Sequence, residues 1–159
     1  MYLTLLKQYQ FLLEARGALL DYCEKIKPGD LSKQVPVFNN NSINYLLVHN
    51  ANVYIHWLAV IGMQNQHSYF DVSFIKEIKP LRMMYDQVNL ITNNFLHQYK
   101  NQLGAPINFL LPGESINLTI SPLQLFTHVI THEFHHKGQI LTMSRLLGYT
   151  PVDTDIIRF

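Results

Sequence analysis

The sequence is poor in features that mark several classes of protein. It has a single cysteine, Cys23, among 159 residues, which excludes an internal disulfide and a thiolate metal cluster. Only 14% of the residues are charged, and 12 Lys and Arg against 11 Asp and Glu leave a formal net charge of +1. Because nucleic-acid binding depends on clustered basic residues, this near-neutral balance argues against a nucleic-acid partner.

Long unbroken apolar stretches are also missing. The most apolar stretch, residues 43–63, is interrupted by asparagines and histidines, so it falls short of the roughly 18 apolar residues that a membrane span needs. The first residues lack the charged start, the apolar run and the small-residue cleavage site of a signal peptide. We therefore predict a cytoplasmic chain that does not enter a membrane, which agrees with its low cysteine content.

Four long segments have the apolar spacing of helices. They span about Tyr2–Lys25, Ser42–Gly62, Phe74–Leu103 and Ser121–Gly148. Ser42 is a good N-cap, Ser121-Pro122-Leu123-Gln124 forms a capping box with proline at the first helical position, and Gly148 is a natural helix end. Pro80 marks either a kink in the third helix or a join between a short turn and that helix.

A short segment between the third and fourth helices has the pattern of a β-hairpin. Pro112-Gly113 separates two runs, Ile107–Leu111 and Ser115–Ile120, and the second run alternates polar and apolar residues. Long helices with apolar faces in a chain of this length predict one all-α domain, residues 1–159. We expect a four-helix bundle with the small β-hairpin before the fourth helix.

The distribution of the eight histidines points to a metal site. His128, His132 and His136 lie along one side of the predicted fourth helix, each about 40° from the last. Buried imidazoles need partners, since an unsatisfied buried polar group costs about 1–3 kcal/mol. Two histidines four residues apart can bind one ion, and this spacing occurs in both 128/132 and 132/136.

A third ligand has to come from another helix. His49 lies on the apolar side of the predicted second helix, so we expect it to face the core. Three imidazoles and one open position are typical of catalytic zinc, whereas structural zinc usually has four protein ligands. The alternative is that these are ordinary hydrogen-bonded histidines, but the repeated spacing favours a metal. We expect His67 and His97 at the surface, and His135 beside the site without being a ligand.

The segment His132-Glu133-Phe134-His135-His136 also fits the H-E-x-x-H motif of zinc metallopeptidases, in which the glutamate is the general base. Such enzymes usually take a third ligand from a later segment. No histidine follows His136, and the only later carboxylates are Asp153 and Asp155. The upstream sheet that aligns a peptide is missing as well, so we rank this alternative low.

The chain resembles the DinB/YfiT-like family over nearly its whole length. The matching features are a histidine about fifty residues in, followed by Trp57-Leu58, then His135-His136-Lys137-Gly138-Gln139 with Lys in place of Arg, and a closing segment 147–151. The resemblance implies an up-down-down-up four-helix bundle, usually a homodimer, that holds nickel or zinc. One ligand would come from the second helix and two from the fourth. By position these are His49, His132 and His136.

The resemblance leaves the reaction open, since relatives include thiol-dependent S-transferases and a thiol-dependent isomerase. We expect a metal-dependent enzyme acting on a small molecule. It would be a transferase using a low-molecular-weight thiol, or a hydrolase using activated water, with Glu133 or His135 as a proton carrier. The alternative is a non-enzymatic metal- or ligand-binding stress protein. The low charged fraction also favours a homodimer, because some apolar surface should stay outside one bundle.

Overall fold

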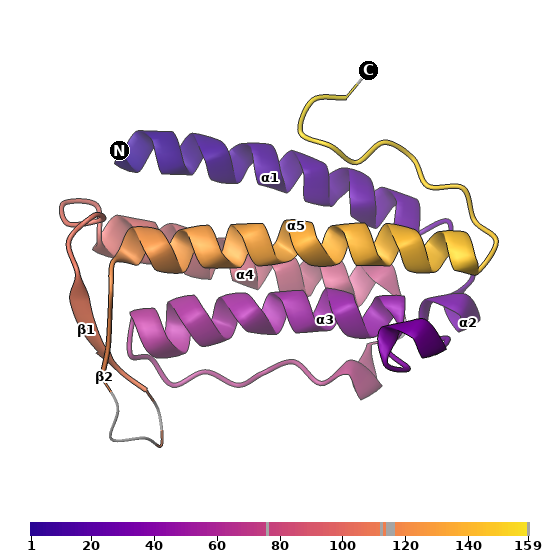
Figure 1. Cartoon of the computed structure of the whole chain (residues 1–159), viewed down its shortest axis with the longest axis horizontal. Coiled ribbons are helices and arrows are strands. Elements are labelled where there is room, and N and C mark those ends of the chain that lie inside the picture. Colours follow the sequence, from indigo (N-terminus) through magenta and orange to yellow (C-terminus); the bar gives the residue numbers. More distant parts are fainter. Residues whose placement is uncertain (76, 112, 114–116, 159) are drawn as a thin grey trace.

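The structure is a computed structural model that describes residues 1–75, 77–111, 113 and 117–158 (Figure 1). The described chain is mostly helical with one small antiparallel sheet, as the sequence predicted. Its long helices are α1 (Tyr2–Cys23), α3 (Ile43–Tyr54) with a π-helical continuation η2 (Ile55–Gly62), α4 (Ile78–Gln98) and α5 (Pro122–Leu146). Shorter turns are α2 (Pro28–Leu31), η1 (Pro36–Phe38) and η3 (Val72–Phe74). Within the described ranges, no helix is long and apolar enough to cross a membrane.

The long helices lie side by side along the long axis of the molecule (Figure 1). Helices α1 and α5 run in one direction, and α3 and α4 run in the other. α3 packs against both α4 and α5, and α1 packs against α4. This arrangement brings α3 and α5 together, which are the two helices that carry the predicted metal ligands.

The predicted hairpin is confirmed for the residues that the structure describes. Strand β1 (Ile107–Leu110) pairs antiparallel with β2 (Asn117–Ile120), with Ile107 opposite Ile120. The remainder of the predicted turn and second run, residues 112 and 114–116, lies outside the described residues. Phe109 of β1 is buried, and its ring centroid lies 6.2 Å from that of Tyr99 just after α4. The hairpin therefore packs over the end of α4.

Local sequence signals account for most of the helix ends. The Ser42 hydroxyl accepts a hydrogen bond from the backbone N–H of Tyr45 at 3.1 Å. The capping box at Ser121 and Gln124 is formed on both sides, which satisfies two backbone donors that the helix leaves free. Gly148 has φ +92°, a left-handed conformation that glycine adopts without a steric penalty.

Two helices, α1 and α4, differ from the prediction in their boundaries. α1 ends at Cys23 instead of Lys25, because the chain turns before the segment that contains Pro28. The third helix begins at Ile78 and ends at Gln98, inside the predicted range, and Val72–Phe74 form a separate turn. Pro80 therefore lies in the first turn of α4. Backbone N–H groups in this turn have no acceptor within the helix, so proline, which lacks an N–H, breaks no helical hydrogen bond here.

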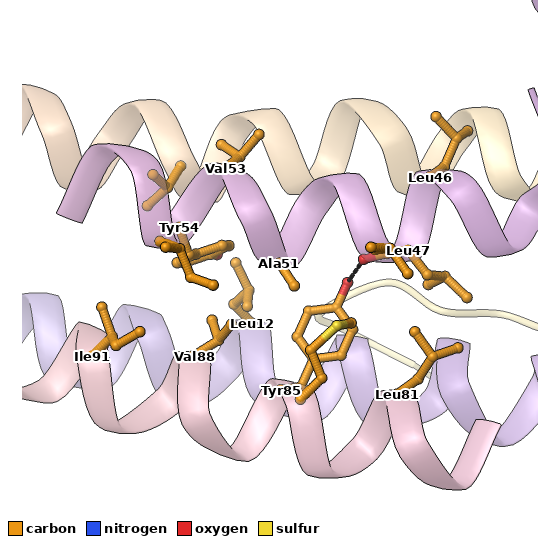
Figure 2. Packing of buried hydrophobic residues seen from close by; sticks show 14 of the residues in the cluster. Leu12, Leu46, Leu47, Ala51, Val53, Tyr54, Leu81, Tyr85, Val88 and Ile91 are labelled. Atoms are coloured by element: carbon orange, nitrogen blue, oxygen red, sulfur yellow. Dashed lines mark hydrogen bonds between the residues drawn. The ribbon is translucent and has the colours of Figure 1, made fainter. Parts of the chain in front are cut away.

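Apolar side chains of α3 and α4 interlock in the core (Figure 2). Leu47, Ala51 and Tyr54 of α3 face Tyr85 and Val88 of α4. The Tyr85 hydroxyl donates to the backbone carbonyl of Leu47 at 2.9 Å, so this polar atom is satisfied inside the core (Figure 2).

The continuation of α3 is wound as a π-helix. Its wider turn is seen where the backbone N–H of Met63 donates to the carbonyl of Leu58, five residues earlier, at 2.9 Å. π-Helical turns are rare and often occur at functional sites. Gly62 ends the segment in close contact with α4, because a Cβ at this position would lie 2.5 Å from the Phe95 ring. The Tyr99 hydroxyl also donates to the Gly62 carbonyl at 2.5 Å.

Candidate metal centre

Three histidines from two helices converge in the groove between α3 and α5. His49 comes from α3, and His132 and His136 come from successive turns of α5. One ring nitrogen of each lies within 4.8 Å of the others, and Nε2 of His49 is 3.1 Å from Nε2 of His132. Two nitrogens that bind one tetrahedral zinc ion at 2.0–2.1 Å lie about 3.3 Å apart. These residues therefore fit a divalent metal ion.

The fold brings His136, and not His128, to His49. The ring centroid of His136 lies 4.9 Å from that of His49 and 4.5 Å from that of His132. His128 is exposed, and its ring lies against Trp57 at 5.0 Å. The sequence allowed either of two histidine pairs, 128/132 or 132/136. The level at which α3 packs against α5 selects the pair 132/136. His128 borders the group without joining it.

Burial favours the neutral, metal-binding form of these imidazoles. It lowers the pKa of His49 below the ordinary histidine value. Burial, followed by the proximity of His136 and His49, lowers the pKa of His132 to about 4. The pKa of His136 is also lowered by burial, although its hydrogen bond with Gln139 opposes the shift. A metal ligand has to be unprotonated, so this environment suits metal binding near neutral pH.

Gln139 fixes the orientation of one imidazole. Its Oε1 lies 2.6 Å from Nδ1 of His136 and accepts a hydrogen bond from that nitrogen. Nε2 of His136 is then left unprotonated to face the other two histidines. The amide Nε2 of Gln139 is 3.2 Å from Nε2 of His135, to which it donates. His135 is exposed, and this hydrogen bond with Gln139 connects it to the site. It therefore lies beside the site, as the sequence predicted.

Tyr45 supports the imidazole of His49 from one turn earlier on α3. The two rings are parallel, with an interplanar angle of 5° and centroids 6.1 Å apart. His67 and His97 are exposed and lie outside the group, in agreement with their predicted surface positions.

Cavities open on both sides of the three histidines. One, of about 410 Å³, is bordered by His49 and His136 together with Asn39, Asn41 and Gln139. The other, of about 350 Å³, is bordered by His49 and His132 and has aromatic walls. We call them the polar cavity and the aromatic cavity. Because each contains two of the three histidines, small molecules can approach the candidate centre from both sides.

Comparisons with known proteins identify the family of the chain. A sequence profile of the DinB family matches residues 1–159. The chain belongs to the DinB family. It is 33% identical over 81 residues to Protein DinB of Bacillus subtilis (strain 168). That alignment covers 50% of this chain and only 45% of the relative, so it spans less than half of that protein's length.

Solved structures of DinB-like proteins share the fold. One from Bacillus cereus ATCC 10987 has a TM-score of 0.71 at 18% identity and covers 94% of both chains. Another, YjoA of Bacillus subtilis, has a TM-score of 0.60 at 21% identity and covers 91% of this chain and 95% of its own. At these identities the likeness concerns the fold.

Glu133 does not face the histidines of this DinB-family chain. It is 6% exposed and points into the bundle. Its Oε1 accepts from Nε of Arg16 at 2.7 Å, and its Oε2 accepts from Nη2 of Arg16 at 2.7 Å and from the Tyr54 hydroxyl at 2.6 Å. Both carboxylate oxygens are therefore engaged by Arg16 and Tyr54 inside the bundle. This placement gives no support to the expectation that Glu133 carries a proton at the centre.

Two contacts, one at the site and one in the interior of the bundle, were not anticipated from the sequence. Tyr45 precedes His49 by four residues, which is the spacing of side chains that meet on one helix face. Arg16 is a single arginine among buried positions of α1 such as Leu12 and Leu19, and this pattern signals a buried ionic partner. Its partner on α5 is visible only in the folded chain.

Proposed function

We propose that this DinB-family chain is a metal-dependent enzyme that acts on a small molecule, with one nickel or zinc ion held by His49, His132 and His136. The observation that carries the proposal is the convergence of three imidazoles at a point open to cavities on both sides. Imidazole suits both ions. Three protein ligands with an open approach are typical of catalytic zinc, and structural zinc is usually closed by a fourth.

The proposed architecture is a single domain, residues 1–159, folded as an up-down-down-up four-helix bundle. The opposite directions of the α1/α5 and α3/α4 pairs support this description (Figure 1). In such a bundle, metal sites are built from side chains of facing helices, which is the placement of the three histidines on α3 and α5.

Among reaction classes we favour transfer of a small thiol to an electrophile, with hydrolysis as the second class. A divalent ion bound here would act as a Lewis acid that lowers the pKa of a coordinated thiol or water. The protein's own contribution is positional. Gln139 orients His136, Tyr45 supports the His49 ring, and the two cavities leave room for two small molecules. The competing proposal, a bundle that only sequesters metal or ligand, predicts binding without turnover.

The test combines metal content with a conjugation assay. Purified chain would be loaded with zinc or nickel, and its stoichiometry measured by elemental analysis. Conjugation of 2-mercaptoethanol, an uncharged thiol, with 1-chloro-2,4-dinitrobenzene is then followed by absorbance. In this reaction the sulfur bonds to the ring carbon, chloride leaves with its electron pair, and the thiol proton passes to solvent. We expect about one ion per chain and a rate above the uncatalysed reaction.

Matched variants make the test specific. His49→Ala and His132→Ala should lose both the ion and the rate enhancement, whereas exposed His97→Ala should keep both. Stoichiometric metal with no conjugation and no ester hydrolysis would favour the sequestering protein. Failure of the wild-type chain to retain any divalent ion after reconstitution would contradict the metal site itself.

We also propose that the chain forms a homodimer. Several large apolar side chains on the long helices are exposed, among them Leu3, Met83 and Leu90. Met83 and Leu90 are seven residues apart on α4 and therefore lie on one face of that helix. Sedimentation at micromolar concentration decides the matter, because a single species of 18.5 kDa would show that the chain is a monomer.

A further inference from the structure

The two cavities beside the candidate metal centre differ in chemistry. Outside His49 and His136, the polar cavity takes its polar lining from Asn39, Asn41 and Gln139, beside Val37, Phe38, Tyr45, Leu46 and Met143. Outside His49 and His132, the aromatic cavity is bordered by Asn52, Val53, His56, Trp57 and Tyr69. Among the described residues, neither cavity is bordered by Lys, Arg, Asp or Glu. Each cavity therefore selects a ligand through shape and polarity, without a side-chain charge.

The wall of the aromatic cavity is held in place by hydrogen bonds to the segment after η2. The Asn52 side chain donates to the backbone carbonyl of Phe70 at 2.9 Å and accepts from the Phe70 N–H at 2.8 Å. The Tyr69 hydroxyl lies 2.8 Å from Nδ1 of His56. The Asn52 amide is thus taken up by the Phe70 backbone, and the Tyr69 hydroxyl is taken up by Nδ1 of His56. The surface left for a ligand is consequently made mainly of rings.

Three rings shape that surface. His56 meets Trp57 edge to face at 5.1 Å and 84°, and it lies 6.2 Å from Tyr69. Both His56 and Trp57 belong to the π-helical segment, and Tyr69 of the following chain segment lies against His56. Rings in offset or edge contact provide faces against which a flat ligand can stack. A volume of about 350 Å³ is at the small end of ligand pockets, so it suits a one-ring compound.

Charge further restricts the class of ligand that the aromatic cavity can bind. An organic cation would be attracted by aromatic faces but repelled by a divalent ion at His49 and His132, which border the same cavity. A phosphate or other polyanion would be attracted by that ion, but it would find no Lys or Arg among the described residues that border the cavity. An uncharged ring is not repelled by the ion and does not need a Lys or Arg partner.

We propose that the aromatic cavity is the binding site for an uncharged, planar one-ring substrate. This inference rests on the proposed function, in which the second reactant approaches the centre from the opposite, polar cavity. Substrate selection then comes from Trp57 and Tyr69. Asn52 is a positioning residue, because it holds the backbone beside Tyr69.

The single tryptophan provides a direct measurement, because Trp57 is the only one in the chain and borders the aromatic cavity. Zinc-loaded protein would be titrated with 4-nitrobenzyl alcohol, a neutral planar quencher of indole fluorescence. Saturation-transfer NMR on the same probe excludes inner-filter artefacts. We expect saturable quenching. Tyr69→Ala, which changes a half-exposed residue outside the helices, should weaken binding at least about fivefold while the helical circular dichroism is unchanged.

Two controls complete the design. Phe11→Ala removes an exposed ring on α1, away from the residues that border the cavity, and should leave probe binding unchanged. The cationic analogue 4-nitrobenzylamine should bind at least about tenfold more weakly to the zinc-loaded chain. Equal binding of both probes, or equal effects of Tyr69→Ala and Phe11→Ala, would overturn the proposal. A chain that binds zinc but not the neutral probe refutes this inference alone, whereas failure to bind zinc refutes the proposed function.

Discussion

Arg16 and Glu133 form a two-pronged ion pair in the interior of the bundle. The guanidinium of Arg16 donates from Nε and Nη2 to the two carboxylate oxygens of Glu133, each at 2.7 Å. Nη1 of Arg16 donates to Oδ1 of Asn89, which also accepts from the Tyr9 hydroxyl. Burial alone would lower the pKa of Arg16, but the Glu133 carboxylate raises it well above its ordinary value. The pair and its partners connect α1, α3, α4 and α5 through Tyr54 and Asn89.

Removing the charge of Glu133 should destabilise the fold without removing the metal ligands. Glu133→Gln leaves the buried guanidinium of Arg16 without its counter-charge, and breaking such a pair costs about 3–5 kcal/mol. Urea denaturation should show this loss in the free energy of unfolding. The control is Asp21→Asn, which weakens the exposed Asp21–Arg82 pair and should cost about 1 kcal/mol or less.

The same variant tests the metallopeptidase alternative. Elemental analysis of folded Glu133→Gln should still find about one zinc per chain, because Glu133 faces away from the three histidines. We also expect no metal-dependent peptide cleavage in the wild-type chain. Proteolysis that disappears in Glu133→Gln would contradict the structural role assigned to this residue.

Gln139 should tune metal affinity without being a ligand. Gln139→Leu removes the acceptor that holds Nδ1 of His136, so the imidazole loses its fixed orientation and tautomer. Losses of this kind typically weaken metal binding 10–100-fold, and we expect about tenfold for zinc in competition with a chelator. Gln87→Leu, an exposed position on α4, makes the same chemical change elsewhere. Similar affinities of the two variants would show that the contact is unimportant for metal binding.

Gly62 and Gly17, each in a helical segment, should respond in opposite ways to substitution by alanine. Gly62→Ala places a methyl group 2.5 Å from the Phe95 ring, and such overpacking typically costs about 1–3 kcal/mol. Gly17→Ala meets nothing within 4 Å in the interior of α1 and should gain up to about 1 kcal/mol from higher helix propensity. Thermal denaturation of both variants measures the difference. A Gly62→Ala protein as stable as wild type would mean that α4 can move away from η2.

Cys23 should resist alkylation in the folded chain. Burial raises the pKa of its thiol from 9.0 to about 12, so the reactive thiolate is depleted about a thousandfold at pH 8. Mass spectrometry after iodoacetamide treatment of the folded protein at pH 8 should find unmodified protein. The same treatment in 8 M urea should rapidly add one label per chain. Since the folded pKa is raised, stability should fall as the pH rises above the unfolded thiol's pKa, near 9. Equal labelling rates with and without urea would show that Cys23 is accessible.

The sequence by itself determined features that depend on neighbours along the chain. Ser42 and the capping box at Ser121 specify helix starts because a side-chain oxygen reaches a backbone N–H only a few residues away. The four-residue spacing of His132 and His136 places both on one side of α5 because the helical period dictates it. The same local rule places His128 on that side, so spacing alone allows two pairs.

Only the tertiary structure decided which side chains meet across helices. His49 packs beside His132 and His136, leaving His128 against Trp57, because α3 and α5 make their closest ring contacts at that level. Glu133 is next to His132 in sequence, yet a rotation of about 100° per residue turns it toward Arg16 on α1. A helical repeat specifies which residues share a face, but the packing of the other helices determines what that face contacts.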